Sequence, residues 1–146
     1  MTVTISESIT SNGKNQGGTQ TLSVPSIATV SRRIIDVPAS EVEILAMSTA
    51  VAAGTFIESD VLYIRITNLD DTNHVTLIFK NESNDEFAIK LDKGQTFIYN
   101  GDLSGGVVDT MDADSSALSV TLADLVNVTA TADTAACDVE VFVACK

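Results

Sequence analysis

The stretch NLDDTNH, residues 68–74, contains the oxygen-rich side chains from which calcium sites are built. Asn68, Asp70, Asp71 and Asn73 could each supply an oxygen, but Ca²⁺ requires about six to eight oxygens at fixed positions. The sequence shows no partner loop that would supply the others. Asn and Asp also stabilise turns through hydrogen bonds between their side chains and the backbone. We therefore expect a turn between two strands, with Asp70 and Asp71 as the weaker candidates for metal ligands.

A second acidic cluster, the stretch DTMDADSS, resembles part of an EF-hand calcium loop. Asp112, Asp114 and Ser116 have the spacing of the first three ligands of that loop. However, Ala117 stands where the loop requires Gly, and Ala123 stands where it requires a bidentate Glu. Asp112 and Asp114 therefore stay candidates only for a cation bound at a contact between subunits. We predict no resident metal and no cofactor.

The chain has a single histidine, His74, and histidine is the usual general base near neutral pH. His74 stands at the expected start of a strand, opposite its apolar face, where a surface histidine is the ordinary interpretation. No GxSxG nucleophile motif occurs. The pairs Gly17-Gly18 and Gly105-Gly106 lie in polar loops, whereas a phosphate-binding loop joins a strand to a helix. We predict no enzyme and no catalytic residue.

Two cysteines, Cys137 and Cys145, stand at the ends of the alternating stretch CDVEVFVAC. In one strand, both thiols would share a face but lie ~26 Å apart. A disulfide requires Cα atoms within about 7 Å of each other. The chain has no CxxC pair and no histidine near these residues. We expect two reduced, buried thiols that pack as small apolar groups.

The net charge of −12, from 20 acidic and 8 basic residues in a chain of 146, is unevenly distributed. Between Lys93 and Lys146 the sequence has eight acidic residues and no basic one. Such a surface repels phosphate, so we expect no nucleic-acid partner. No apolar run approaches the ~20 residues of a membrane helix, and the first residues lack the basic start of a signal peptide. We expect a soluble protein with no membrane partner.

Apolar and polar residues alternate with a period of two from Val61 onward, which is the pattern of strands with one buried face. The segment SEVEILAMSTAVAAG also carries a helical capping box, Ser40 and Glu43. We nevertheless predict a strand over Val42–Ser48, because the later pattern is β. The other predicted strands cover 61–69, 74–81, 86–94, 95–101, 117–125, 126–133 and 137–145, with a polar loop over 100–117. Eight to ten short strands predict an all-β fold, a single antiparallel β-sandwich with jelly-roll-like wiring, for a body of residues 37–146.

Residues 1–36 differ from this body, because Glu7 and Lys14 are the only charged residues before Arg32. The segment SNGKNQGGTQ has the composition of a flexible polar loop. One interpretation of the whole region is a mobile terminus. We favour an extended N-terminal arm that adds a strand to a neighbouring subunit. Its candidate partner-binding residues are Val3, Ile5, Leu22, Val24, Ile27 and Val30.

The stretch DVLYIRITNLDDTNHVTLIFKNESNDEFAIKLDKGQTFIYNG, residues 60–101, resembles small virion proteins of tailed, often marine, bacteriophages. The resemblance is carried by Tyr63 to Asn73, an aromatic strand followed by ITNLDDTN, and by Phe87 to Gly94, the pattern F-A-x-K-L-x-x-G. It covers about 40 of the 146 residues and contains no catalytic motif. The resemblance implies a β-sandwich structural component of a phage particle.

The physical pattern and the resemblance together predict a structural protein of a virion, made in the host cytoplasm. Our first expectation is a capsid decoration or cement protein. It would bind the major capsid protein, or another virion protein, as a homo-oligomer and stabilise the shell. The alternatives are a tail or tail-fibre structural or adhesion protein and, from another class, a calcium-dependent ligand-binding module.

Overall fold

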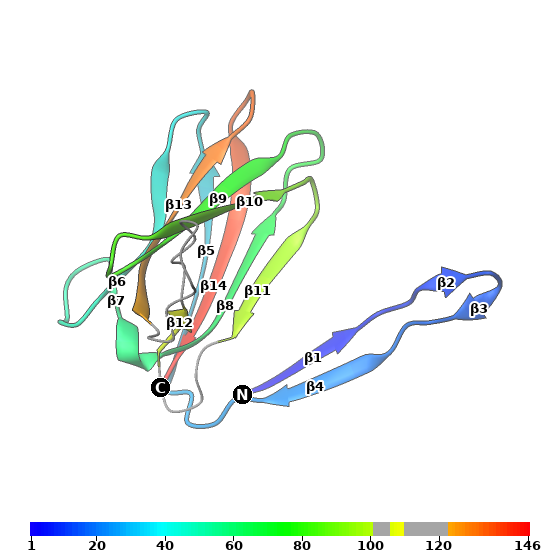
Figure 1. The fold of residues 1–146 in the computed structure, drawn as a ribbon, viewed down its shortest axis with the longest axis horizontal. Coiled ribbons are helices and arrows are strands. Elements are labelled where there is room, and N and C mark those ends of the chain that lie inside the picture. Colours follow the sequence, from blue (N-terminus) through cyan, green and yellow to red (C-terminus); the bar gives the residue numbers. More distant parts are fainter. Residues whose placement is uncertain (101–105, 110–122) are drawn as a thin grey trace, which may run out of the picture.

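The computed structural model describes residues 1–100, 106–109 and 123–146. In these residues the chain is all-β, with fourteen strands and a single short 3₁₀ turn over Glu58–Asp60. No helix among them is long and apolar enough to cross a membrane. Figure 1 shows a body of two facing sheets, from whose foot a long hairpin projects, with both termini at that foot.

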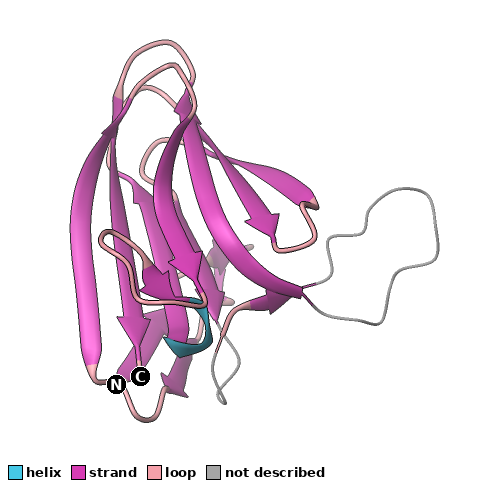
Figure 2. Cartoon of the chain, turned by 90° about the vertical axis from the view of Figure 1, so that its left-hand side faces the viewer, coloured by secondary structure: helices cyan, strands magenta, loops and turns pink. Residues whose placement is uncertain are grey.

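Two sheets pack face to face in the body, as Figure 2 shows from the side. One sheet has the order β11-β8-β14-β5, with bounds β11 Thr96–Asn100, β8 Val61–Asn68, β14 Cys137–Cys145 and β5 Thr29–Val37. The other has the order β10-β9-β13-β6-β7, with bounds β10 Glu86–Leu91, β9 Val75–Asn81, β13 Ala123–Ala132, β6 Val42–Ser48 and β7 Phe56–Ile57. The short strand β12, Val108–Asp109, pairs with β13. The predicted β-sandwich is therefore confirmed.

The order of the strands shows how the chain is wired. Among the long strands that the structure describes, β9 and β10 are the only sequence neighbours that pair in one sheet. Each of the other connections between long strands passes to the opposite sheet. The predicted jelly-roll wiring is compatible with this order. One detail differs from the all-antiparallel prediction: β6 and β7 pair in parallel over two residue pairs.

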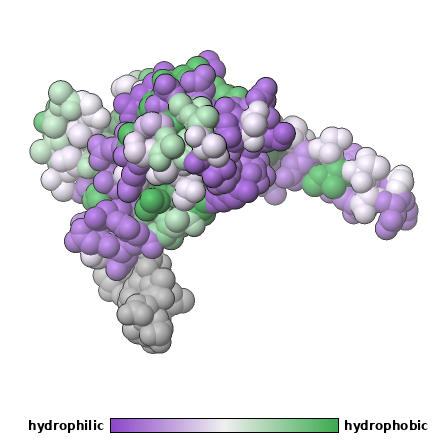
Figure 3. All heavy atoms as spheres, turned by 90° about the horizontal axis from the view of Figure 1, so that it is seen from above, coloured by the Kyte–Doolittle hydropathy of each residue, from purple (hydrophilic) through white to green (hydrophobic). Residues whose placement is uncertain are grey.

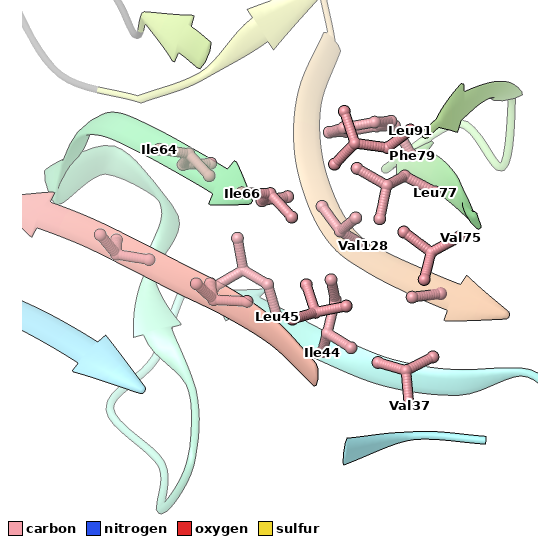
Figure 4. Close-up of a cluster of buried hydrophobic side chains, with 14 of the residues drawn as sticks. Val37, Ile44, Leu45, Ile64, Ile66, Val75, Leu77, Phe79, Leu91 and Val128 are labelled. Atoms are coloured by element: carbon pink, nitrogen blue, oxygen red, sulfur yellow. The ribbon is translucent and has the colours of Figure 1, made fainter. Parts of the chain in front are cut away.

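The core lies between the two sheets and is built from the period-2 apolar residues (Figure 4). Val75, Leu77 and Phe79 of β9 are fully buried, as their alternation predicts. The ring of Phe79 stacks on Phe87 of β10, with ring centroids 4.6 Å apart, and contacts Phe97 of β11 at 5.0 Å. Aromatic pairs at such distances stabilise a core beyond the area that they bury, and this one joins the two sheets.

Most strands follow the sequence prediction, and several segments differ from it. The short strands β7 and β12 were not predicted, and β12 lies within the predicted polar loop over 100–117. The ambiguous segment Val42–Ser48 is a strand with the predicted bounds, β6. The separate strands predicted over 117–125 and 126–133 are replaced, where the structure describes them, by one strand, β13, that runs from Ala123 to Ala132. The boundary of the arm also lies earlier than residue 36. All nine residues of β5 pair with β14, so residues 29–36 belong to the body sheet.

The arm is a two-stranded hairpin rather than a single extended strand. Its strands are β1 Thr2–Ser6, β2 Thr10–Ser11, β3 Lys14–Asn15 and β4 Thr19–Ser23. β1 pairs with β4, and β2 pairs with β3. The segment predicted as a polar loop forms the tip, where Asn12 and Gly13 both have positive φ angles, 52° and 74°. Such a pair is typical of a two-residue type I′ turn, for which Asn-Gly is the preferred sequence.

Candidate functional site

The turn at residues 68–74 is organised by Asn68, which is fully buried. Its side-chain nitrogen donates to the carbonyl oxygens of Asn73 at 2.9 Å and Leu91 at 3.1 Å. Its side-chain oxygen accepts from the backbone N–H of Asp70 at 3.0 Å. One side chain therefore joins this turn to the end of β10, as the role of Asn in turns predicts.

Asp70 uses its carboxylate within the same turn. One carboxylate oxygen accepts from the backbone N–H groups of Thr72 at 2.7 Å and Asn73 at 2.5 Å. These bonds, first that of Asn73 and then that of Thr72, hold the pKa of Asp70 below its ordinary value. The charge of Asp70 therefore stabilises the turn itself, and Asp71 accepts from the hydroxyl of Thr72 at 2.8 Å.

The two segments that carry the phage resemblance meet at this turn. The backbone N–H of Asn68 donates to the carbonyl of Gln95 at 3.0 Å, and that of Gly94 donates to the carbonyl of Asn68 at 3.1 Å. Gly94 has a φ of 70°, which favours glycine. The stretches ITNLDDTN and FAIKLDKG therefore form one structural unit, because each supplies hydrogen-bond partners to the other.

An acidic pocket adjoins the turn at one end of the sandwich. Its lining includes Asp70 and Asp71 from the turn, Asp36 from β5 and Asp138 from β14. Among the residues that the structure describes, no group of three or more His, Cys, Asp or Glu side chains is arranged to hold a metal ion. The other two metal candidates, Asp112 and Asp114, lie outside the described residues.

His74 stands immediately before β9, as predicted, with about a quarter of its side chain exposed. Its Nδ1 lies 3.5 Å from a carboxylate oxygen of Asp133. The backbone N–H of Asp133 also donates to the carbonyl of His74 at 3.1 Å. These contacts join the start of β9 to the end of β13, so the position of His74 has a structural explanation.

Both cysteines are free and buried on β14, as the sequence predicted. Burial raises the pKa of the Cys137 thiol, and the carboxylates of Asp70 and Asp133 raise it further. Burial also raises the pKa of Cys145. Because their pKa values are raised, both thiols are protonated at neutral pH, and the thiolate is the reactive form. Both groups therefore pack as small apolar side chains.

The sequence analysis did not single out Glu140, which is nearly buried on β14 between two arginines. Nε of Arg32, on β5, donates to one carboxylate oxygen at 2.6 Å, and Nη2 of Arg65, on β8, donates to the other at 2.6 Å. The guanidinium of Arg65 also lies 5.3 Å from the ring centre of Phe142. The available signal was an acidic residue within the otherwise apolar run VEVFVA. The cluster ties three neighbouring strands together on the outer face of their sheet.

Most residues of the hairpin are exposed, and its two faces differ. The register of β1 and β4 places Val3 opposite Leu22 and Ile5 opposite Gln20. The other face carries only hydroxyl side chains, those of Thr2, Thr4, Ser6, Thr19, Thr21 and Ser23. A pocket at the root of the apolar face reaches Asn100 at the end of β11. Figure 3 shows the arm leaving the body, with a small hydrophobic area part-way along an otherwise polar surface.

The six predicted arm residues fall in three places. Val3, Ile5 and Leu22 share the apolar face of the hairpin. Val24 is fully buried. It is therefore not accessible to a partner, contrary to the expectation from the sequence. Ile27 is partly buried in the connection to the body, and Val30 lies on β5 of the body sheet.

A second exposed apolar surface lies on β5. Val30 and Ile34 project from the outer face of the sheet, with 57% and 58% of their surface exposed. β5 is also an edge strand, since in the described part of the chain it pairs with β14 alone. An exposed edge strand with apolar side chains is a site for pairing with another chain.

Comparison of the chain with protein-family models, with curated proteins and with solved structures finds no match.

Proposed function

We propose that this chain is a structural component of a bacteriophage particle, a decoration or cement protein that binds the major capsid protein and stabilises the shell. The observation that carries the proposal is the amphipathic hairpin that projects from a sandwich with a single continuous core. An isolated two-stranded hairpin is marginally stable in water. Burial of its apolar face against another protein would therefore stabilise the hairpin.

Two further features support this proposal. The segments that resemble phage virion proteins form one hydrogen-bonded unit around Asn68, so the resemblance concerns the framework of the body. The arm contains one acidic residue, Glu7, and one basic residue, Lys14, so the net charge of −12 resides in residues 24–146. A neutral arm can approach a shell while the acidic bodies keep assembled particles apart in solution.

The proposal is tested on particles of the virus that encodes the chain. Particles are banded in a density gradient, the chain is quantified in each band, and gold-labelled antibody against its C-terminus locates it. We expect the chain in the particle band, in a fixed ratio to the major capsid protein, with the label on the heads. Label confined to the tails would replace the decoration function with a tail function. A chain present only in the unassembled fraction would contradict both.

A matched variant tests the role of the arm in the same assay. Deleting residues 2–22 removes the hairpin and leaves β5 and the body sheets complete. We expect shells that lack the chain to take up the full-length protein and to take up the deleted protein poorly. Shells decorated with the full-length chain should also withstand a higher temperature before they release their DNA.

A further inference from the structure

The hairpin of the arm presents an apolar face that its own body leaves largely exposed. The pairs Ser6–Thr19 and Thr10–Asn15 are in the same register, with no residue inserted between them. Residues 2–11 therefore form one side of the hairpin, with strand over 2–6 and 10–11 and a non-strand segment over 7–9 between them. Ile5 and Ile9 stand four residues apart on this side and are 38% and 47% exposed. Since strand side chains alternate, both project from the same face.

The body presents a surface that can receive such a hairpin, the free edge of β5. Its nine residues pair with β14 without a register shift, and no proline interrupts them. Prolines and bulges are devices by which proteins protect an edge from pairing. Six large apolar side chains are exposed in the described residues, and four of them lie on these two surfaces: Ile5, Ile9, Val30 and Ile34.

Length and charge also match. One side of the hairpin spans residues 2–11, with five strand residues in β1 and two in β2, and β5 offers nine. Two bodies that each carry a net charge of −12 repel one another. The neutral hairpin does not add to that repulsion, and β5 carries two arginines, Arg32 and Arg33, against one acid, Asp36.

The foot of the hairpin directs it away from its own β5. The terminal amine of Met1 donates to the carbonyl of Val24 at 2.8 Å, and the N–H of Val24 donates back to Met1 at 2.9 Å. The N–H of Ala28 then donates to the carbonyl of Cys145 at 2.9 Å, which fixes the start of β5 on the body. With this root the hairpin points outward from the sandwich (Figure 1). The partner edge is therefore that of another copy.

We propose that the hairpin of one copy adds to the free edge of β5 in a second copy and extends its four-stranded sheet. Each copy then donates one hairpin and accepts one, so the contact is head to tail and generates a ring or a filament. This inference rests on the proposed function as an assembly protein and identifies the surface through which copies of the chain associate.

The test uses purified full-length chain and two variants that keep the β propensity of each strand. Ile5→Thr with Ile9→Thr removes the apolar side chains of the donor, and Val30→Thr with Ile34→Thr removes those of the acceptor. Sedimentation should show the wild type associating as its concentration rises. Each variant should raise the dissociation constant about tenfold or more. Val51→Thr, at a site that is 85% exposed and outside both surfaces, should change nothing.

Mixing the two variants separates head-to-tail pairing from every other contact. The acceptor variant keeps an intact hairpin, and the donor variant keeps an intact β5. We expect each alone to stay monomeric and the mixture to form a dimer and nothing larger. An acceptor variant that assembles as well as the wild type would overturn the proposal in favour of pairing between hairpins. A mixture that stays monomeric, or a wild type that is monomeric at about 100 µM, would overturn it too.

Failure of this inference is distinguishable from failure of the proposed function. A chain that is monomeric alone but bound to particles refutes the pairing of copies and leaves the structural function standing. A chain that assembles alone but is absent from particles does the reverse.

Discussion

Asn68 organises the turn that the sequence made the first candidate for chemistry. Three of its hydrogen-bond partners belong to the backbone of the turn or of β10, and the side chain itself is fully buried. Buried polar groups contribute stability when each has a partner and cost stability when one is removed. The side-chain oxygens of Asn68 and Asp70, which could have indicated a calcium site, therefore hold the backbone of the turn.

Replacing Asn68 tests this structural role. Asn68→Ala leaves the buried carbonyl of Leu91 without its donor, and we expect the free energy of unfolding to fall by about 2–3 kcal/mol. Asn68→Asp keeps the shape but buries a charge beside Asp70, so it should cost more. Denaturant unfolding measures both. Thr72→Ala, in the exposed part of the same turn, is the control and should change stability by less than about 0.5 kcal/mol.

Glu140 gives a prediction that depends on pH. The hydrogen bond from Arg32, together with that from Arg65, holds the pKa of Glu140 below its ordinary value. A carboxyl group whose pKa is lower in the folded state stabilises the fold above its unfolded pKa and loses that contribution as the pH falls through its folded pKa. We expect wild-type stability to decline below about pH 4 and Glu140→Gln to flatten that decline.

At pH 7 Glu140→Gln should lower the free energy of unfolding by about 1–3 kcal/mol, because it removes two charge-assisted hydrogen bonds. Glu86→Gln is the matched control, since Glu86 is exposed and its partner, the partly exposed Lys80, lies 3.4 Å away. Exposed pairs of this kind contribute less than about 1 kcal/mol. Equal effects of the two substitutions would show that the buried cluster has no special role.

At the scale of elements, strands in which apolar and polar residues alternate regularly could be predicted from the sequence. Strands whose alternation is interrupted by charged residues could not. β9 and β10 alternate cleanly and form as expected. β5 contains the adjacent pair Arg32-Arg33, which hides its alternation. The structure satisfies both side chains, because Arg32 binds Glu140 and Arg33 donates to the carbonyl of Ile44 on β6.

The hairpin was missed for a different reason. Its composition is polar and rich in glycine, and composition alone indicates a loop. The local signal was the dipeptide Asn12-Gly13 between two alternating stretches, which is a strong signature of a two-residue hairpin turn. Gly17 is a further constraint that the sequence does not reveal. A Cβ atom there would lie 2.1 Å from the carbonyl oxygen of Glu7 on the opposite side of the hairpin.

The corrected boundary of the arm predicts the outcome of two deletions. Removing residues 2–22 takes away the hairpin and should leave the melting temperature within a few degrees, since the core between the sheets is intact. Removing residues 2–35 also takes most of β5 from the edge of the sheet and uncovers β14. We expect that chain to melt far lower or to aggregate. Circular dichroism measures both melting temperatures. Equal melting temperatures of the two deletion variants would contradict the place of β5 in the body.

The whole molecule combines a strongly acidic body with a neutral arm, and this separation predicts how salt affects assembly. Repulsion between bodies is screened at high ionic strength, whereas the apolar contact of the arm is not. We expect association of purified chain, measured by sedimentation, to strengthen as NaCl rises from about 50 to about 500 mM. Weakening over the same range would show that pairs of opposite charge, and not apolar side chains, join the copies.

The central claim is that the hairpin is a docking element, and hydrogen exchange of its backbone amides tests it most directly. The amides of residues 2–23 are compared between dilute, monomeric chain and chain in its assembled state, with the strands of the core as the internal reference. We predict that exchange along the hairpin slows at least about tenfold on assembly, that β5 slows with it, and that β9 and β13 stay unchanged. Equal exchange of the hairpin in the two states would contradict the account.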